Sequence, residues 1–529
     1  MTVSKLRDLF SSPRFVIAVF IFLILTGLAV LASRNALFVA GDAGTKLLQT
    51  QDFVAHDFKS FSCIYPGKSI DPEEEFFPFW APFAYKLNGN CQYVFPVFLA
   101  AFNTPAFLLA KGAGFFLISA LASIGIIFLV SGIGSTLNLN QRERAIVLWI
   151  AALGIGLPSY ALNPNEPAIS CFFSLLAVYY FLRETNTCYV LSGMAVGVGL
   201  LLRPDAVLTG AALGLSMLIF YRVPFSQKLG RLIRFSVPIV FFAGVLFLVN
   251  FALFGHPMGV RSHEVEGMET HVAVRLASLM SYLFGNSEAV FVRTPIFILA
   301  IFLCAALLLR NRSAIFSEIT ATPRVLTLIL CVVIVIFVIP FLWTNPNHGG
   351  PRFGERHLFN AYPLLAILSG VFLTRVKLQI WPARILVVLV VASVVFTSRA
   401  NLQGFKGSLN LQRVRALDSM ALIKGTEPNA VVILRHFYLG DMIYASFLDR
   451  VYFVADNDAK FAKLEARLRS QGVRSYYVLH SRAPFRGTIS DASGKEMHFP
   501  ETMVPQGTFY KSVSDDRGTE LWELRRYDL

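Results

Sequence analysis

Long apolar runs recur along this chain and are separated by short polar segments. Each run has roughly 15 to 20 residues, close to the length of an α-helix that crosses a bilayer. We therefore predict an all-α polytopic membrane domain of about eleven transmembrane helices over residues 1–398. The predicted spans are 15–33, 113–134, 145–162, 168–182, 189–202, 206–221, 235–255, 291–309, 325–343, 359–374 and 384–398.

The pattern changes in two places. Residues 34–110 are acidic and then aromatic and proline-broken, as in FFPFWAPF, which predicts a first outer loop with interfacial helices. The run 92–110 carries Pro96 and Pro105, and we interpret it as interfacial or re-entrant. From residue 399 onward, short apolar runs alternate with helix-like stretches. This predicts a small soluble α/β domain over 399–529, which we interpret as an accessory domain.

Composition and charge agree with this picture. The chain is 55% hydrophobic, with a mean hydropathy of +0.59, which excludes an ordinary soluble protein. The net charge of +14 does not indicate nucleic-acid binding, because the basic residues fall in short clusters between apolar runs. Such clusters mark cytoplasmic loops. The basic loop from Arg222 to Arg234 contains no acids and is the strongest of these signals.

The N-terminus carries Lys5, Arg7 and Arg14 before the first apolar run. That run is longer than a signal-peptide core and has no small-x-small cleavage site after it, so we predict a retained span and a cytoplasmic N-terminus. Eleven spans then place the C-terminal domain outside the cytoplasm, although one miscounted span would reverse this. We expect a multi-pass protein of a bacterial inner (plasma) membrane, while an endomembrane is also compatible with the sequence.

Two of the six cysteines, Cys63 and Cys91, share the first outer loop. A disulfide between them would suit an oxidising compartment, but spacing alone does not decide whether it forms.

The candidate catalytic residues stand at the predicted outer ends of the spans. Asp42 follows the first span, Glu166 the third and Arg203 the fifth. The run GGPRFGERH before the tenth span adds three more, Arg352, Arg356 and His357. A carboxylate suits a general base, and arginines bind phosphate oxygens at two points. We interpret Asp42 and Glu166 as catalytic residues, and Arg203 with the residues from the GGPRFGERH run as a site for a donor phosphate.

Each of these residues has a simpler interpretation. Asp42 can be an ordinary loop acid, Glu166 can cap the following helix, and Arg203 can reach to the membrane interface. Further candidates for substrate binding are Lys46, Asp52, Arg261 and His263. The sequence leaves open whether Asp42 or Asp52 is the base. Residues 256–271 are rich in His and Glu, but their spacing matches no metal signature. No cofactor is therefore assigned, and a requirement for a divalent metal stays open.

Taken together and in order, these motifs resemble the GT-C superfamily of membrane glycosyltransferases, which includes protein O-mannosyltransferases and aminoarabinose lipid A transferases. The resemblance is carried by the acid in the first outer loop, the Glu166-Pro167 pair, GMAVGVGLLLRPDAV and GGPRFGERHLFNAYPLL. It departs from the family at Asp42, whose neighbours are Gly41 and Ala43 where an acidic or aromatic residue is common.

The resemblance implies transfer of a hexose or pentose from a polyprenyl-phosphate donor to an extracytoplasmic acceptor hydroxyl, with inversion. The acceptor would be a cell-envelope glycan, a lipid or a protein. The alternatives are a transporter or flippase, or an O-antigen polymerase or ligase, each acting on lipid-linked glycans. A transporter would show internal repeats and charged residues near mid-span, and neither is evident here.

Overall fold

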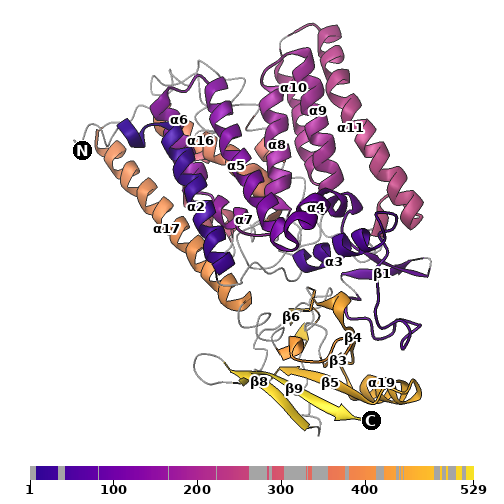
Figure 1. The fold of residues 1–529 in the computed structure, drawn as a ribbon. Helices are drawn as coiled ribbons and strands as arrows, with labels where there is room; N and C mark the ends of the chain where they lie inside the picture. The colour runs from indigo at the N-terminus through magenta and orange to yellow at the C-terminus, as the bar shows by residue number, and fades with distance from the viewer. Residues whose placement is uncertain are drawn as a thin grey trace. The chain divides into compact units, whose positions relative to one another are not determined.

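The computed structural model describes 8–33, 42–80, 83–87, 89–164, 166–221, 223–260, 289–302, 356–375, 380–412, 422–435, 446–481, 508–514 and 520–529, with short pieces between them. These residues form two compact units, shown as a ribbon in Figure 1. The helical unit comprises residues 1–30 and 105–407, and the mixed unit comprises residues 31–104 and 408–529. The mixed unit therefore combines two segments that lie far apart in the sequence.

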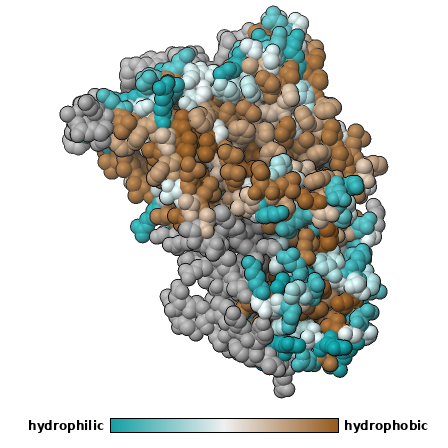
Figure 2. Space-filling model, viewed as in Figure 1, coloured by the Kyte–Doolittle hydropathy of each residue, from teal (hydrophilic) through white to brown (hydrophobic). Residues whose placement is uncertain are grey.

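The described helices follow the apolar runs. Five of them are long and apolar enough to cross a membrane: Pro13–Ala32, Ala113–Thr136, Phe225–Phe254, Leu358–Arg375 and Arg384–Gln403. Figure 2 shows hydrophobic side chains over much of the visible surface of the helical unit, as expected for helices that face lipid. Residues 303–309 of the predicted run 291–309, and most of the run 325–343, lie outside the described residues.

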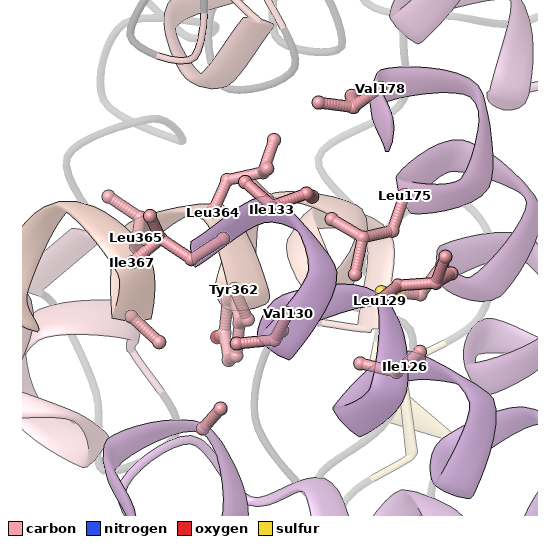
Figure 3. Close-up of a cluster of buried hydrophobic side chains, with 14 of the residues drawn as sticks. Ile126, Leu129, Val130, Ile133, Leu175, Val178, Tyr362, Leu364, Leu365 and Ile367 are labelled. Atoms are coloured by element: carbon pink, nitrogen blue, oxygen red, sulfur yellow. The ribbon is translucent and has the colours of Figure 1, made fainter. Parts of the chain in front are cut away.

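The main helices of this unit are α2 (Pro13–Ser33), α5 (Ala113–Thr136), α6 (Gln141–Leu153), α7 (Leu157–Ala161), α8 (Pro167–Phe181), α9 (Asn186–Leu202), α10 (Ala206–Phe220), α11 (Phe225–Phe254), α16 (Tyr362–Arg375) and α17 (Ile380–Gln412). Shorter elements are α13 (Val290–Arg293), η3 (Pro295–Phe297) and η5 (Arg356–Ala361). Side chains from α5, α8 and α16 meet in the core, where Ile126, Leu175 and Leu364 are among the residues shown in Figure 3.

Three predicted elements differ from the observed ones. The described part of the run 291–309 is not one helix, because Pro295 interrupts it: the chain forms α13 (Val290–Arg293), the 3-10 helix η3 (Pro295–Phe297) and a further helical stretch over 298–302. The run 145–162 forms two helices, α6 and α7, because Gly156 has a positive φ of 73° that ends helical geometry before Pro158. The run 92–110 begins in a strand, β2 (Asn90–Tyr93), which pairs antiparallel with β1 (Ala84–Leu87). Only then does the chain enter α4 (Val97–Ala110), which contains Pro105.

The mixed unit contains a five-stranded sheet in the order β4-β3-β5-β9-β8. Strands β3 (Val431–Leu434), β4 (Val451–Val454) and β5 (Ser475–Ser481) are parallel, while β8 (Thr508–Ser514) and β9 (Glu520–Asp528) join antiparallel. These strands lie where the short apolar runs predicted them. A separate two-stranded sheet joins β6 (Ile489–Ser490) and β7 (Glu496–Met497). Helix α19 (Asp458–Ser470) begins at Asn457, whose side chain accepts a hydrogen bond from the backbone N–H of Lys460.

Residues from the segment 42–104 pack on this sheet. The backbone N–H of Val454, on edge strand β4, donates to the carbonyl of Phe76 at 2.9 Å. The carboxylate of Asp71 is fully buried and accepts hydrogen bonds from the Tyr65 hydroxyl at 3.0 Å and from the Phe76 N–H at 2.8 Å. Asp71 also pairs with Arg467 of α19 at 2.5 Å. Residues 31–104 and 408–529 thus share one core and one buried ion pair.

Candidate functional site

Helix α3 (Asp42–Ala55) carries three of the predicted site residues, Asp42, Lys46 and Asp52. Asp42 lies in the first turn, where the helix dipole favours a carboxylate. The helix is buried from Ala43 to Thr50, although several of these residues are polar. Polar side chains are seldom buried without partners, so α3 is a candidate for function as well as structure.

The first turn of α3 lies against Tyr444, which comes from the C-terminal segment of the mixed unit. The Thr45 hydroxyl and the Tyr444 hydroxyl are 3.0 Å apart and share a hydrogen bond. A Cβ atom at Gly44 would lie 2.0 Å from the Tyr444 ring, so only glycine permits this approach. The position of Asp42 therefore depends on a contact made some 400 residues further along the chain.

Lys46 and Gln49 face the segment that follows β2. The Lys46 ammonium lies 4.4 Å from the centre of the Phe95 ring, a cation–π contact, and the side chain is almost fully buried. The Gln49 amide donates to the Phe95 carbonyl at 3.0 Å.

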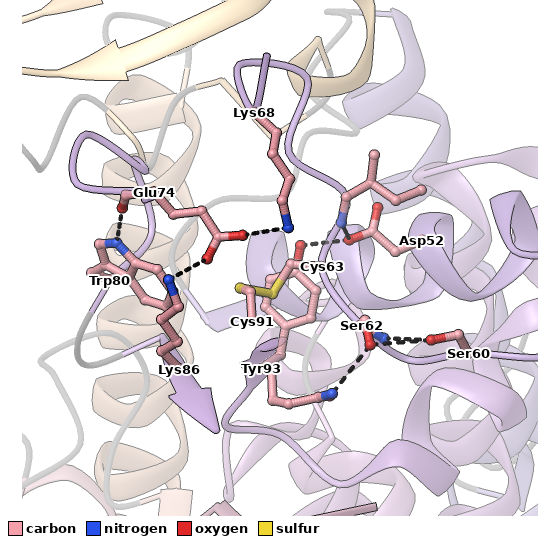
Figure 4. The surroundings of a disulfide bond; sticks show 12 residues. Asp52, Ser60, Ser62, Cys63, Lys68, Glu74, Trp80, Lys86, Cys91 and Tyr93 are labelled. Atoms are coloured by element: carbon pink, nitrogen blue, oxygen red, sulfur yellow. Dashed lines mark hydrogen bonds and ion pairs between the residues drawn. A yellow bond between two sulfur atoms is a disulfide. The ribbon is translucent and has the colours of Figure 1, made fainter. Parts of the chain in front are cut away.

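Asp52 lies near the C-terminal end of α3 and has no exposed surface. Its Oδ2 atom accepts a hydrogen bond from the backbone N–H of Ile64 at 2.9 Å and another from the Tyr93 hydroxyl at 2.7 Å, near the disulfide drawn in Figure 4. Its Oδ1 atom has no hydrogen-bond partner among the described residues. Burial raises the pKa of Asp52 to about 7, against the two hydrogen bonds, which lower the pKa.

The disulfide that the sequence left open is present in the structure. It joins Cys63 to Cys91 of strand β2, and the Cys63 N–H donates to the Cys91 carbonyl at 3.0 Å.

A second polar cluster lies in the helical unit, at the ends of α8 and α9. Arg203 follows α9, and its Nε atom lies 2.8 Å from the Asp205 carboxylate. An Nη atom of Arg203 lies 4.0 Å from the Glu166 carboxylate. Glu166 occupies the N-cap position of α8 and makes no side-chain capping hydrogen bond there, so only the helix dipole supports the capping interpretation. One guanidinium thus faces two carboxylates, and the three side chains together carry one negative charge.

This cluster extends to η5. The Ser170 hydroxyl donates to Asp205 at 3.3 Å, and the Asn360 amide donates to Ser170 at 3.2 Å. Asn360 belongs to η5, the short helix that begins with Arg356 and His357. The structure therefore brings the backbone of Arg356 and His357 into the same region as Glu166 and Arg203.

Three members of this network had no predicted role. Asp205 and Ser170 could have been found, because Asp205 stands two residues after Arg203 and Ser170 one helical turn after Glu166. Asn360 had no comparable signal.

The remaining predicted site residues are not brought together in the described part of the chain. Arg352, Arg261 and His263 lie outside the described residues. Asp42, Lys46 and Asp52 belong to the mixed unit, whereas Glu166 and Arg203 belong to the helical unit. Within the described part of the chain, no group of three or more His, Cys, Asp or Glu residues is arranged to hold a metal ion.

Comparison with known proteins gives relatives only at the level of structure. No family model and no curated protein matches the sequence. ArnT from Cupriavidus metallidurans, in the apo state, matches over 95% of this chain and 97% of its own, with 13% identity and a TM-score of 0.51. The oligosaccharyltransferase AglB from Archaeoglobus fulgidus matches over 87% of this chain and 69% of its own, with 12% identity and a TM-score of 0.47. The arabinofuranosyltransferase AftD from Mycobacteria matches over 96% of this chain and 41% of its own, with 12% identity and a TM-score of 0.49.

At such low identity the likeness to ArnT concerns the fold, and it extends over nearly the whole of both chains. The chain therefore shares the fold of ArnT. This fold, together with the apolar helices, supports a multi-pass membrane protein.

Proposed function

We propose that this protein is an inverting membrane glycosyltransferase that moves a sugar from a polyprenyl-phosphate donor to an acceptor hydroxyl outside the cytoplasm. The observation that carries the proposal is the likeness to the ArnT fold over 95% of the chain. The polar cluster of Glu166, Arg203 and Asp205 supports it, because ionisable groups at the ends of apolar helices are costly to keep without a function.

Asp42 is the proposed general base. Its carboxylate takes the proton from the acceptor hydroxyl as the hydroxyl oxygen attacks the anomeric carbon. The bond from that carbon to the lipid phosphate breaks on the opposite face, which inverts the configuration, and the phosphate leaves with the electron pair. The position of Asp42 in the first turn of α3 supports this role, because the Tyr444 contacts to Thr45 and Gly44 hold that turn.

Arg352, Arg356 and His357 are the proposed ligands of the departing phosphate, whose developing charge they would stabilise. The charge of Arg203 is largely offset by Asp205 and Glu166, so we assign it a secondary part at the phosphate. Its main proposed role is to orient Glu166, the second catalytic candidate, toward the substrates. Arg261 and His263 remain proposed substrate contacts, whereas the buried contact of Lys46 with Phe95 favours a structural role for Lys46.

The proposed site faces the side of the membrane opposite the basic loop 222–234. The disulfide in the mixed unit supports that side, because disulfides persist in oxidising compartments.

The test is Asp42→Asn in membranes supplied with a polyprenyl-phosphate sugar. Loss of a general base should lower the transfer rate by about 10²- to 10⁴-fold. Asp57→Asn is the matched control, because Asp57 is exposed just after the same helix and has a positive φ of 51°, which asparagine also tolerates. Transfer at the wild-type rate by Asp42→Asn would contradict the proposed base. Parallel membranes are supplied with a polyprenyl-diphosphate glycan, and transfer from that donor alone, with release of the lipid diphosphate, would indicate a polymerase or ligase.

A further inference from the structure

Three segments of the mixed unit meet at Asp52. The residue itself belongs to α3, Ile64 belongs to the segment after α3, and Tyr93 ends strand β2. Both donors reach the same oxygen, Oδ2, and the carboxylate has no exposed surface. An acceptor hydroxyl has no route to such a group, whereas a group held by two donors is suited to fixing the position of a helix.

Both hydrogen-bond donors to Asp52 lie within two residues of a disulfide-bonded cysteine. Ile64 directly follows Cys63, and Tyr93 stands two residues after Cys91 on the same strand, so that Cys91 and Tyr93 point to one face of β2. The segment around Cys63 also pairs with β2 through the bridge between Ser62 and Gln92. The covalent bond therefore keeps the Ile64 N–H and the Tyr93 hydroxyl beside each other and opposite Asp52 (Figure 4).

The contacts continue along the same face of α3. Lys46, Gln49 and Asp52 are three residues apart, so they lie along one side of the helix. Lys46 and Gln49 both contact Phe95, and Asp52 contacts Tyr93, two residues earlier. Asp52 thus makes the last of three contacts between α3 and the segment 93–95, at the end of the helix away from Asp42.

We propose that Asp52 is a positioning residue that, together with the Cys63–Cys91 disulfide, fixes helix α3 and thereby the placement of Asp42. The part that concerns Asp42 rests on the proposed function. Asp52 and Asp42 are ten residues apart, about 15 Å along a helix, so a small tilt at one end displaces the other. A displacement of about 1 Å at a reacting group can lower a rate by about 100-fold.

The competing assignment is Asp52 as the base. Burial raises the pKa of Asp52 to about 7, a value that would suit a base, but the same burial shields the carboxylate from a hydroxyl substrate. Geometry therefore favours positioning, and the two assignments predict opposite results for one substitution.

That substitution is Asp52→Asn. The asparagine side-chain oxygen can still accept hydrogen bonds from Ile64 and Tyr93 but cannot take a proton. We expect it to keep the amide hydrogen exchange of α3 at the wild-type rate and to keep transfer within about threefold, unlike Asp42→Asn. Asp52→Leu, which has a similar size and no acceptor, should raise exchange in α3 at least tenfold and lower kcat more than it changes KM.

Tyr93→Phe removes a single donor and tests the same role with little loss of packing. It should raise exchange in α3 by a smaller factor than Asp52→Leu.

The disulfide gives an independent arm of the test. Replacing Cys63 and Cys91 together by serine should raise exchange in α3, and adding this change to Asp52→Leu should have little further effect, because both release the same contact. Cys188→Ser is the control, since Cys188 is a free cysteine in the helical unit, and it should leave α3 exchange unchanged.

Two results would overturn the proposal. One is loss of transfer in Asp52→Asn with unchanged exchange in α3, which would make Asp52 the base. The other is wild-type exchange in both Asp52→Leu and the double serine variant. If the wild-type protein transfers no sugar from any lipid-phosphate donor, the proposed function fails, while the exchange rates still decide whether Asp52 and the disulfide position α3.

Discussion

The ion pair between Asp71 and Arg467 joins two segments of the mixed unit that are 396 residues apart. We predict that Arg467→Ala destabilises this unit strongly. Asp71 has no exposed surface, and its remaining partners, the Tyr65 hydroxyl and the Phe76 N–H, are both neutral. The substitution therefore leaves a buried carboxylate without its compensating positive charge.

Removing one partner of a buried ion pair costs about 3 to 5 kcal/mol. Arg467 is itself 21% exposed, so water can approach from its side and the cost should fall near 3 kcal/mol. For a unit of this size, about 3 kcal/mol corresponds to a decrease in Tm of roughly 6 to 12 °C. Asp71→Asn should cost less, because Arg467 keeps a second acid, Glu75, at 3.7 Å.

The measurement is thermal unfolding of the full chain in detergent, followed by the circular dichroism of the sheet. Arg469→Ala is a matched control on the same helix: Arg469 is 62% exposed and pairs with Glu465 at 3.5 Å, a surface contact worth about 0.5 kcal/mol or less. Equal, small decreases in Tm for both variants would show that Arg467 does not stabilise the buried carboxylate. A double-mutant cycle of Asp71→Asn with Arg467→Ala should give a coupling energy above about 1 kcal/mol.

Two further predictions concern packing and pH. Gly193→Ala should destabilise the helical unit by about 1 to 3 kcal/mol in thermal unfolding, because the new Cβ would lie 2.0 Å from the Phe235 carbonyl oxygen of α11. Gly244→Ala is the control and should be neutral or stabilising, because its Cβ would have no atom within 4 Å. Equal effects of the two substitutions would refute the close approach of α9 and α11. The pKa of Asp52 is raised from 3.8 to about 7, so the folded chain holds a proton between pH 4 and 7 that the unfolded chain has lost. The contribution of Asp52 to the free energy of unfolding should therefore fall by roughly 4 kcal/mol as the pH rises through that window and stay level above it. Asp52→Asn should abolish this pH dependence. Identical pH profiles of unfolding for the wild-type protein and Asp52→Asn would contradict the raised pKa.

Much of the secondary structure could be predicted because its signals are local. The apolar runs predicted helices such as α5 and α9, and the short apolar runs after residue 430 predicted strands β3, β4 and β5. Local signals failed at Gly156, where one left-handed residue divides a continuous apolar run into α6 and α7. Hydrophobicity does not report a change of backbone conformation at a single glycine.

The sequence suggested candidate site residues by their type and their place at the ends of predicted spans, but it assigned no role to their partners. The sequence grouped Glu166 and Arg203, and the structure adds Asp205, which neutralises much of the arginine charge and alters what Arg203 can bind. The sequence also left Asp52 open as an alternative to Asp42, the preferred base, since both acids lie in the segment that follows the first span. Burial and two hydrogen-bond donors now distinguish them, because Asp42 is partly exposed whereas Asp52 is enclosed.

The sequence by itself predicted a polytopic helical protein with a strand-rich C-terminal segment. Periodicity, charge bias and motif order depend on near neighbours in the chain, so one sequence is enough to read them. Only the tertiary structure decided that residues 31–104 pack with residues 408–529, that Cys63 bonds to Cys91, and that Asp71 pairs with Arg467. Such pairings depend on which surfaces fit together after the chain has folded, and separation along the sequence carries no information about that fit.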